Sequence, residues 1–131
     1  MTLRGSCQCG AVSFELEPPF ARFIHCYCSR CRKATGTGRA SNLVLSPSQL
    51  RWLSGEEQIA RFDLPQARSF ATCFCRRCGS PLPHPTRSGR ELIVPAGTLD
   101  DPLPHGPTRR AHWSSRAGWI AERDCDLPDL E

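Results

Sequence analysis

Short runs of alternating apolar and polar side chains recur along the chain, and turn-forming residues separate them. In the range 10–17, Val12, Phe14 and Leu16 alternate with other side chains as in a half-buried strand, and two prolines end the run. No stretch of ten or more residues keeps a helical period, while prolines and glycines occur throughout. The pattern therefore predicts a mostly β fold of short antiparallel sheets.

A second predicted strand, residues 20–28, leads into a group of cysteines. It would carry Cys26 and Cys28 on one face, because side chains two positions apart on a strand point the same way. Cys31 would follow in a turn, and residues 32–36 would form a short helical turn. Further strands are predicted, the first three of them as a meander, at residues 41–45, 50–53, 58–64, 68–75 and 92–94.

The length of 131 residues fits one domain, which we expect to span residues 1–131 with its core at about 4–120. Trp113 and Trp119 are expected to cover one end of the sheet, and order is expected to fade beyond residue 120. The first residues lack the apolar segment of a secretory signal, and no apolar run reaches membrane-spanning length. We therefore expect a cytoplasmic protein with no membrane partner.

The formal net charge of +4 is modest, and sixteen of the seventeen basic residues are arginine. Several of them flank cysteines, namely Arg30, Arg32, Lys33, Arg76 and Arg77. Such charge either offsets the negative charge of metal-bound thiolates or attracts a small anionic thiol or acid. No aromatic stripe, Lys/Arg block or DNA-reading helix accompanies it, which argues against a nucleic-acid partner.

Eight of the nine cysteines fall into close groups. The groups are Cys7 with Cys9, then Cys26, Cys28 and Cys31, and finally Cys73, Cys75 and Cys78. An odd count in a reducing compartment argues against disulfides. C-x-C and C-x-x-C spacings instead let neighbouring thiolates reach one tetrahedral metal ion, for which Zn²⁺ is the usual choice.

These sulfurs can be divided between two zinc ions per chain. One closed structural site needs four ligands, and the outer groups provide them as Cys7, Cys9, Cys75 and Cys78. The remaining trio of Cys26, Cys28 and Cys31 would hold a second ion. Three thiolates leave that ion little positive charge to acidify water, so the ligand set favours capture of a substrate thiol as the fourth ligand, with a lowered thiol pKa.

The sequence leaves the fourth ligand of the second ion undecided. Cys73, His84, His112 or Cys125 could provide it. Both ions would then be structural, and the chain would be a non-catalytic zinc-binding module for a protein or nucleic-acid partner. A position left for an outside thiol predicts an enzyme instead. A third hypothesis is redox sensing by Cys73 or Cys125.

The cysteine motifs and several other segments occur in a distinctive order. They are residues 5–14, 26–36, 74–82, 97–102 and 112–116 together with Trp119. In this order they resemble the glutathione-dependent formaldehyde-activating enzyme family, whose zinc domain is shared with centromere protein V. The resemblance covers about residues 4–119, and Cys73 and Cys125 lie outside the family pattern. It implies a tent-like β fold with a structural zinc on the four outer cysteines and a catalytic zinc on the trio.

The resemblance also implies an activity and partners. The family is named for making S-(hydroxymethyl)glutathione from glutathione and formaldehyde, which is a carbon-sulfur lyase reaction in the synthetic direction. The expected partners are therefore a small thiol such as glutathione and a small aldehyde. Arg32, Lys33 and Arg116 are candidates for binding the glutathione carboxylates.

Overall fold

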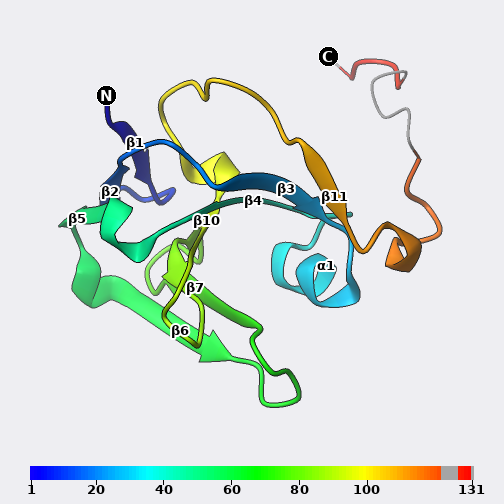
Figure 1. The fold of residues 1–131 in the computed structure, drawn as a ribbon, viewed down its shortest axis with the longest axis horizontal. Coiled ribbons are helices and arrows are strands. Elements are labelled where there is room, and N and C mark those ends of the chain that lie inside the picture. Colours follow the sequence, from blue (N-terminus) through cyan, green and yellow to red (C-terminus); the bar gives the residue numbers. More distant parts are fainter. Residues whose placement is uncertain (122–126, 131) are drawn as a thin grey trace.

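The computed structural model describes residues 1–121 and 127–130 and is built from three small β-sheets (Figure 1). The N-terminal sheet has the strand order β1-β2-β5, and neighbouring strands in it run antiparallel. Its strands are β1 (Leu3–Ser6), β2 (Ser13–Leu16) and β5 (Leu50–Ser54). Phe14 and Leu16 are fully buried, which confirms the predicted alternation over this segment.

The central sheet is the largest and has the order β11-β3-β4-β10-β9. Its strands are β3 (Arg22–Cys26), β4 (Ala40–Leu45), β9 (His84–Pro85), β10 (Leu92–Pro95) and β11 (Arg109–Ala111). All neighbours are antiparallel except β11, which runs parallel to β3 and places Ala111 opposite Cys26. This pairing brings a segment from late in the chain next to the cysteine trio.

The third sheet, which we call the hairpin sheet, has the order β6-β7-β8 and is antiparallel. Its strands are β6 (Ile59–Asp63), β7 (Ala71–Cys75) and β8 (Pro81–Leu82). Cys73 and Cys75 are buried, whereas Phe74 between them is partly exposed, as expected for side chains that alternate across a sheet.

The described residues form one short α-helix and several single 3₁₀ turns. The α-helix α1 (Ser29–Thr35) lies below the central sheet in Figure 1 and contacts β4. Single 3₁₀ turns occur at η1 (Pro47–Gln49), η2 (Glu56–Gln58), η3 (Ala96–Thr98) and η4 (Trp113–Ser115). No helix within the described residues has the length and apolarity needed to cross a bilayer. The mostly β prediction is confirmed.

All three sheets contribute to one apolar core. Phe14 of the N-terminal sheet, Leu43 of the central sheet and Leu82 of the hairpin sheet have no exposed surface. Sheets this small cannot each bury a hydrophobic face alone, so their stability depends on packing together. The cysteine groups lie where these sheets meet.

Three of the local predictions were wrong. The expected meander does not form, because β4, β5 and β6 belong to three different sheets. The strand expected over residues 20–28 ends at Cys26, and Cys31 lies in α1 rather than in a turn. Trp119 is 71% exposed rather than packed over an end of the sheet, whereas Trp113 is partly buried and packs edge-on against Tyr27. The expected loss of order beyond residue 120 mostly concerns residues 122–126, which include Cys125. These residues lie outside the described part of the chain.

Candidate metal centres

The four outer cysteines meet in one place. The sulfurs of Cys7, Cys9, Cys75 and Cys78 all lie within 4.8 Å of one another. Cys9 Sγ is 3.6 Å from Cys7 Sγ and 3.9 Å from Cys75 Sγ. A tetrahedron with zinc-sulfur bonds of about 2.3 Å has edges of about 3.8 Å. The donors and their spacing therefore fit a zinc ion, and the site ties the N-terminal sheet to the hairpin sheet.

Two similar turns present these sulfurs. One follows β1 and the other follows β7, and each closes through a glycine with positive φ, Gly10 at 78° and Gly79 at 78°. The backbone N–H of Val12 donates to Cys7 Sγ at 3.3 Å, and that of Arg77 donates to Cys75 Sγ at 3.4 Å. Such hydrogen bonds stabilise thiolates.

Two of these thiols have lowered pKa values. Burial opposes ionisation of Cys7, but the Val12 N–H and neighbouring sulfurs hold the pKa of Cys7 below its ordinary value. The Ser80 hydroxyl, 3.3 Å from Cys78 Sγ, lowers the pKa of Cys78 to about 5. Because Ser80 Oγ also accepts a hydrogen bond from Gln8 N–H at 2.9 Å, it connects the two turns. Sequence reasoning had assigned no role to Ser80.

The cysteine trio forms a second group. The sulfurs of Cys26, Cys28 and Cys31 lie within 4.8 Å of one another, with Cys26 and Cys28 3.5 Å apart. Cys26 is the last residue of β3 and Cys31 lies in the first turn of α1. Cys28 is the N-cap residue of α1, and its sulfur accepts the N–H of Cys31 at 3.4 Å. The capping turn, rather than a shared strand face, brings the sulfurs together.

The trio is prepared to carry negative charge. Hydrogen bonding to Cys31 is the main cause that lowers the pKa of the Cys26 thiol to about 5, and the nearby His112 contributes. The same interaction and burial raise the pKa of Cys31. In the protein without metal, Cys26 is therefore the first of the two to ionise, and its charge is shared within the group.

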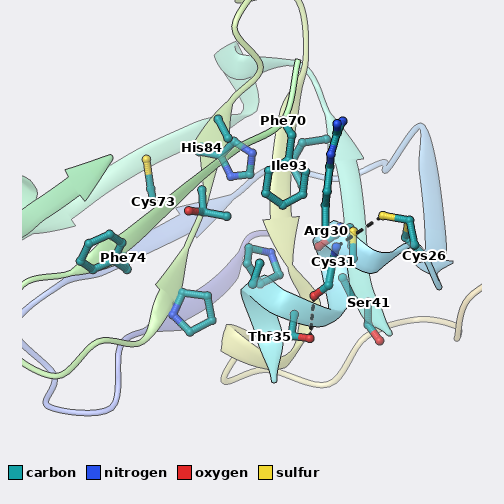
Figure 2. A pocket seen from close by; sticks show the side chains of 18 of the residues that line it. Cys26, Arg30, Cys31, Thr35, Ser41, Phe70, Cys73, Phe74, His84 and Ile93 are labelled. Carbon is teal, nitrogen blue, oxygen red and sulfur yellow. Dashed lines mark hydrogen bonds between the residues drawn. The ribbon is translucent and has the colours of Figure 1, made fainter. Parts of the chain in front are cut away.

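A pocket of about 590 Å³ opens beside the trio. Figure 2 shows Cys26 and Cys31 on one side and Cys73 and His84 on the other, with Phe70 and Ile93 between them. The pocket lies between two walls. The central sheet and α1 form one wall, and the hairpin sheet forms the opposite wall. The trio can therefore be reached by a small molecule.

The candidates for a fourth protein ligand lie nearby. Cys73, His84 and His112 all line this pocket, yet among the described residues the group within 4.8 Å comprises the three sulfurs alone. Burial raises the pKa of the Cys73 thiol and lowers that of the His84 imidazole to about 4. Cys125, the remaining candidate, lies outside the described residues.

Comparison with known proteins adds an independent observation. The sequence model of the family described as glutathione-dependent formaldehyde-activating enzyme matches residues 2–116. The chain belongs to this family. A Halomonas elongata protein, provisionally named a glutathione-dependent formaldehyde-activating enzyme, is 35% identical over 119 residues, which cover 83% of this chain and 73% of that protein. The resemblance inferred from the ordered motifs is confirmed.

A solved structure also matches. A crystal structure of a Rhodobacter sphaeroides protein has a TM-score of 0.65 to this chain and is 30% identical in sequence. The match covers 82% of this chain and 99% of the other. The two proteins therefore share most of their fold.

The basic residues expected at a glutathione site lie outside the pocket. Arg32 Nη1 donates to the carbonyl oxygens of Tyr27 at 2.8 Å and Ser115 at 2.7 Å. Arg116 Nη1 donates to the carbonyl of Trp113 at 3.0 Å, and its guanidinium lies 4.3 Å from the centre of that ring. Their binding of glutathione, and that of Lys33, stays a prediction.

The pocket is instead lined by other residues. Arg30 supplies a guanidinium, one of the charges that the sequence linked either to thiolates or to a small anionic ligand. Phe70 and Ile93, to which the sequence had assigned no role at a substrate site, supply apolar walls. Phe70 also packs against the cluster of Cys26, Cys31 and Ala40. Phe70 precedes β7 directly, and no local motif marks it, because its role depends on how the hairpin sheet folds over the trio.

Proposed function

We propose that this family member is a zinc-dependent enzyme that joins a thiol to a small aldehyde at the cysteine trio. Glutathione and formaldehyde are the pair in the family name. The observation that carries the proposal is the placement of three clustered sulfurs in the wall of a pocket of about 590 Å³. The four-sulfur group would hold a second Zn²⁺ that stabilises the fold.

The residues of the trio would hold the catalytic ion as thiolates. Zn²⁺ bound there would supply a Lewis acid that lowers the pKa of an incoming thiol. The N–H of Cys31 and the α1 capping turn keep Cys28 in place, and Phe70 shields Cys26 and Cys31 from water. The trio would thus remain fixed while the substrates exchange.

The reaction balances without a further reagent. The substrate thiol loses its proton, and its sulfur attacks the aldehyde carbon. A carbon-sulfur bond forms while the carbonyl π bond opens, and a proton returns to the oxygen. The product is a hydroxymethyl thioether when the aldehyde is formaldehyde. The reverse reaction is the carbon-sulfur lyase direction.

Exchange spectroscopy tests the proposal, because the adduct also forms without an enzyme. With ¹³C-formaldehyde and glutathione at equilibrium, zinc-loaded protein should speed exchange between free and adduct carbon, and Cys28→Ser should remove that acceleration. Cys73→Ala should retain it. Loss of the second zinc in Cys73→Ala, together with no acceleration by the unmodified protein, would instead support a closed structural site and a non-catalytic module. Absence of acceleration by the unmodified protein, with glutathione and likewise with 2-mercaptoethanol and benzyl mercaptan, would refute the enzyme.

A further inference from the structure

We infer that the thiol bound at the cysteine trio has an apolar body rather than the charged peptide body of glutathione. This inference rests on the proposed thiol-binding function and concerns its substrate class. The observation behind it is the character of the pocket wall, which is largely aliphatic and aromatic next to the sulfurs.

The apolar walls nearest the trio come from two parts of the fold. Phe70, which precedes β7, lines the pocket and packs directly against the cluster that contains Cys26 and Cys31. Ile93 of β10 also faces the pocket, while its neighbours Leu92 and Val94 are buried on the other side of the strand. Farther apolar side chains of the lining are Ile24 and Phe74. A ligand whose sulfur reaches the trio must place the rest of its body against this surface.

The charges of the pocket do not match glutathione, which carries two carboxylates and one ammonium group. Arg30 supplies one guanidinium, and the imidazole of His112 also lines the pocket but interacts with the Cys26 thiolate. Burial lowers the pKa of His84 to about 4, so this side chain is neutral at pH 7. Among the described residues that line the pocket there is no Asp or Glu to accept the ammonium. Leaving such charges unpaired in an apolar site carries a large desolvation cost.

The size of the pocket supports a ligand with a substantial body. Its volume of about 590 Å³ lies within the range of about 300–1,000 Å³ typical of sites for drug-sized molecules. A water-sized aldehyde such as formaldehyde would fill little of it. Burial of a ring or alkyl chain against Phe70 and Ile93 would provide the binding free energy that ion pairs cannot provide here.

Calorimetric titration of the zinc-loaded protein with three thiols tests the inference. Benzyl mercaptan supplies an apolar body, glutathione a charged one, and 2-mercaptoethanol almost none. We expect benzyl mercaptan to bind at least about tenfold more tightly than glutathione. Equal or tighter binding of glutathione would overturn this inference but leave the proposed function standing. Failure of all three thiols to bind would overturn both.

Two matched variants locate the apolar body. Phe70→Ala should weaken the binding of benzyl mercaptan at least about fivefold more than that of 2-mercaptoethanol, because only benzyl mercaptan contacts the ring. Phe62→Ala removes an aromatic ring that is 50% exposed outside the pocket and should change neither. If benzyl mercaptan binds Phe70→Ala as tightly as the unmodified protein, the apolar body does not lie in this pocket and the inference fails.

Discussion

The two cysteine groups should respond very differently to loss of one sulfur. Cys75 has no exposed surface and belongs to the group that connects two sheets. A structural zinc contributes about 10–16 kcal/mol, so losing one of its four ligands removes roughly 3 kcal/mol. The buried serine hydroxyl adds about 1–3 kcal/mol in Cys75→Ser. The sum of about 4–6 kcal/mol is a large part of the stability of a small domain, which is about 5–15 kcal/mol.

Cys28→Ser should cost far less, about 1 kcal/mol or below. Cys28 caps α1 through its side chain, and serine is a preferred N-cap residue. The trio also spans only six consecutive residues, so an unfolded chain can still bind metal there, which reduces the stabilisation that metal gives to the native state. Cys28→Ala, which removes the cap as well, should be about 1 kcal/mol less stable than Cys28→Ser.

Urea denaturation of the zinc-loaded variants, followed by circular dichroism, measures these free energies of unfolding. Cys75→Ser should be insoluble or strongly destabilised, whereas Cys28→Ser should unfold close to the unmodified protein and lose thiol binding. Equal destabilisation of the two serine variants would refute the division of the cysteines into one structural group and one catalytic group.

Three further predictions concern residues outside the metal groups. Gly5→Ala should lower the free energy of unfolding by about 1–3 kcal/mol, because the new Cβ would overlap the fully buried ring of Phe14. Gly97 has open space around its Cα, so Gly97→Ala should change the free energy of unfolding little in the same denaturation assay. In a proton NMR titration, His84 should titrate near pH 4 because burial lowers its pKa. The unfolded chain then binds more protons between about pH 4 and 6.5, so this group should destabilise the fold by up to about 3 kcal/mol as pH falls through that window. A His84 midpoint near pH 6.5 would contradict the burial argument. Cys73 should react with iodoacetamide at least about tenfold more slowly than free cysteine, as located by mass spectrometry, because burial raises its thiol pKa. Rapid alkylation would support the redox-sensor hypothesis instead.

The two groups of metal ligands could be predicted from the sequence because the ligands within each cysteine motif lie only a few residues apart. Four of the ligands form C-x-C or C-x-x-C pairs, and each pair fits a turn closed by glycine, as at Gly10 and Gly79. The mostly β composition followed from alternation at positions such as Phe14. Each of these patterns spans only a few residues, so it can be recognised without knowledge of the fold.

The pocket could not be anticipated in the same way because it depends on distant pairings. The parallel pairing of β11 with β3 places His112, one of the four candidate ligands from the sequence, near Cys26. The hairpin sheet places Phe70 there as well, and no motif near Phe70 in the sequence indicates this. The extended reading of residues 20–28 failed for a local reason. Cys28 Sγ accepts the N–H of Cys31, so Cys28 caps a helix that begins at Ser29 instead of ending the strand.

X-ray absorption at the zinc edge tests the central claim most directly. For protein with two zinc ions per chain, the account predicts an average of about 3.5 sulfur ligands per zinc and a light-atom shell at about 2.0 Å. Adding a thiol that binds should raise the average to about 4 and remove the light-atom shell. Four sulfurs per zinc before any thiol is added, or a spectrum that no thiol alters, would contradict it.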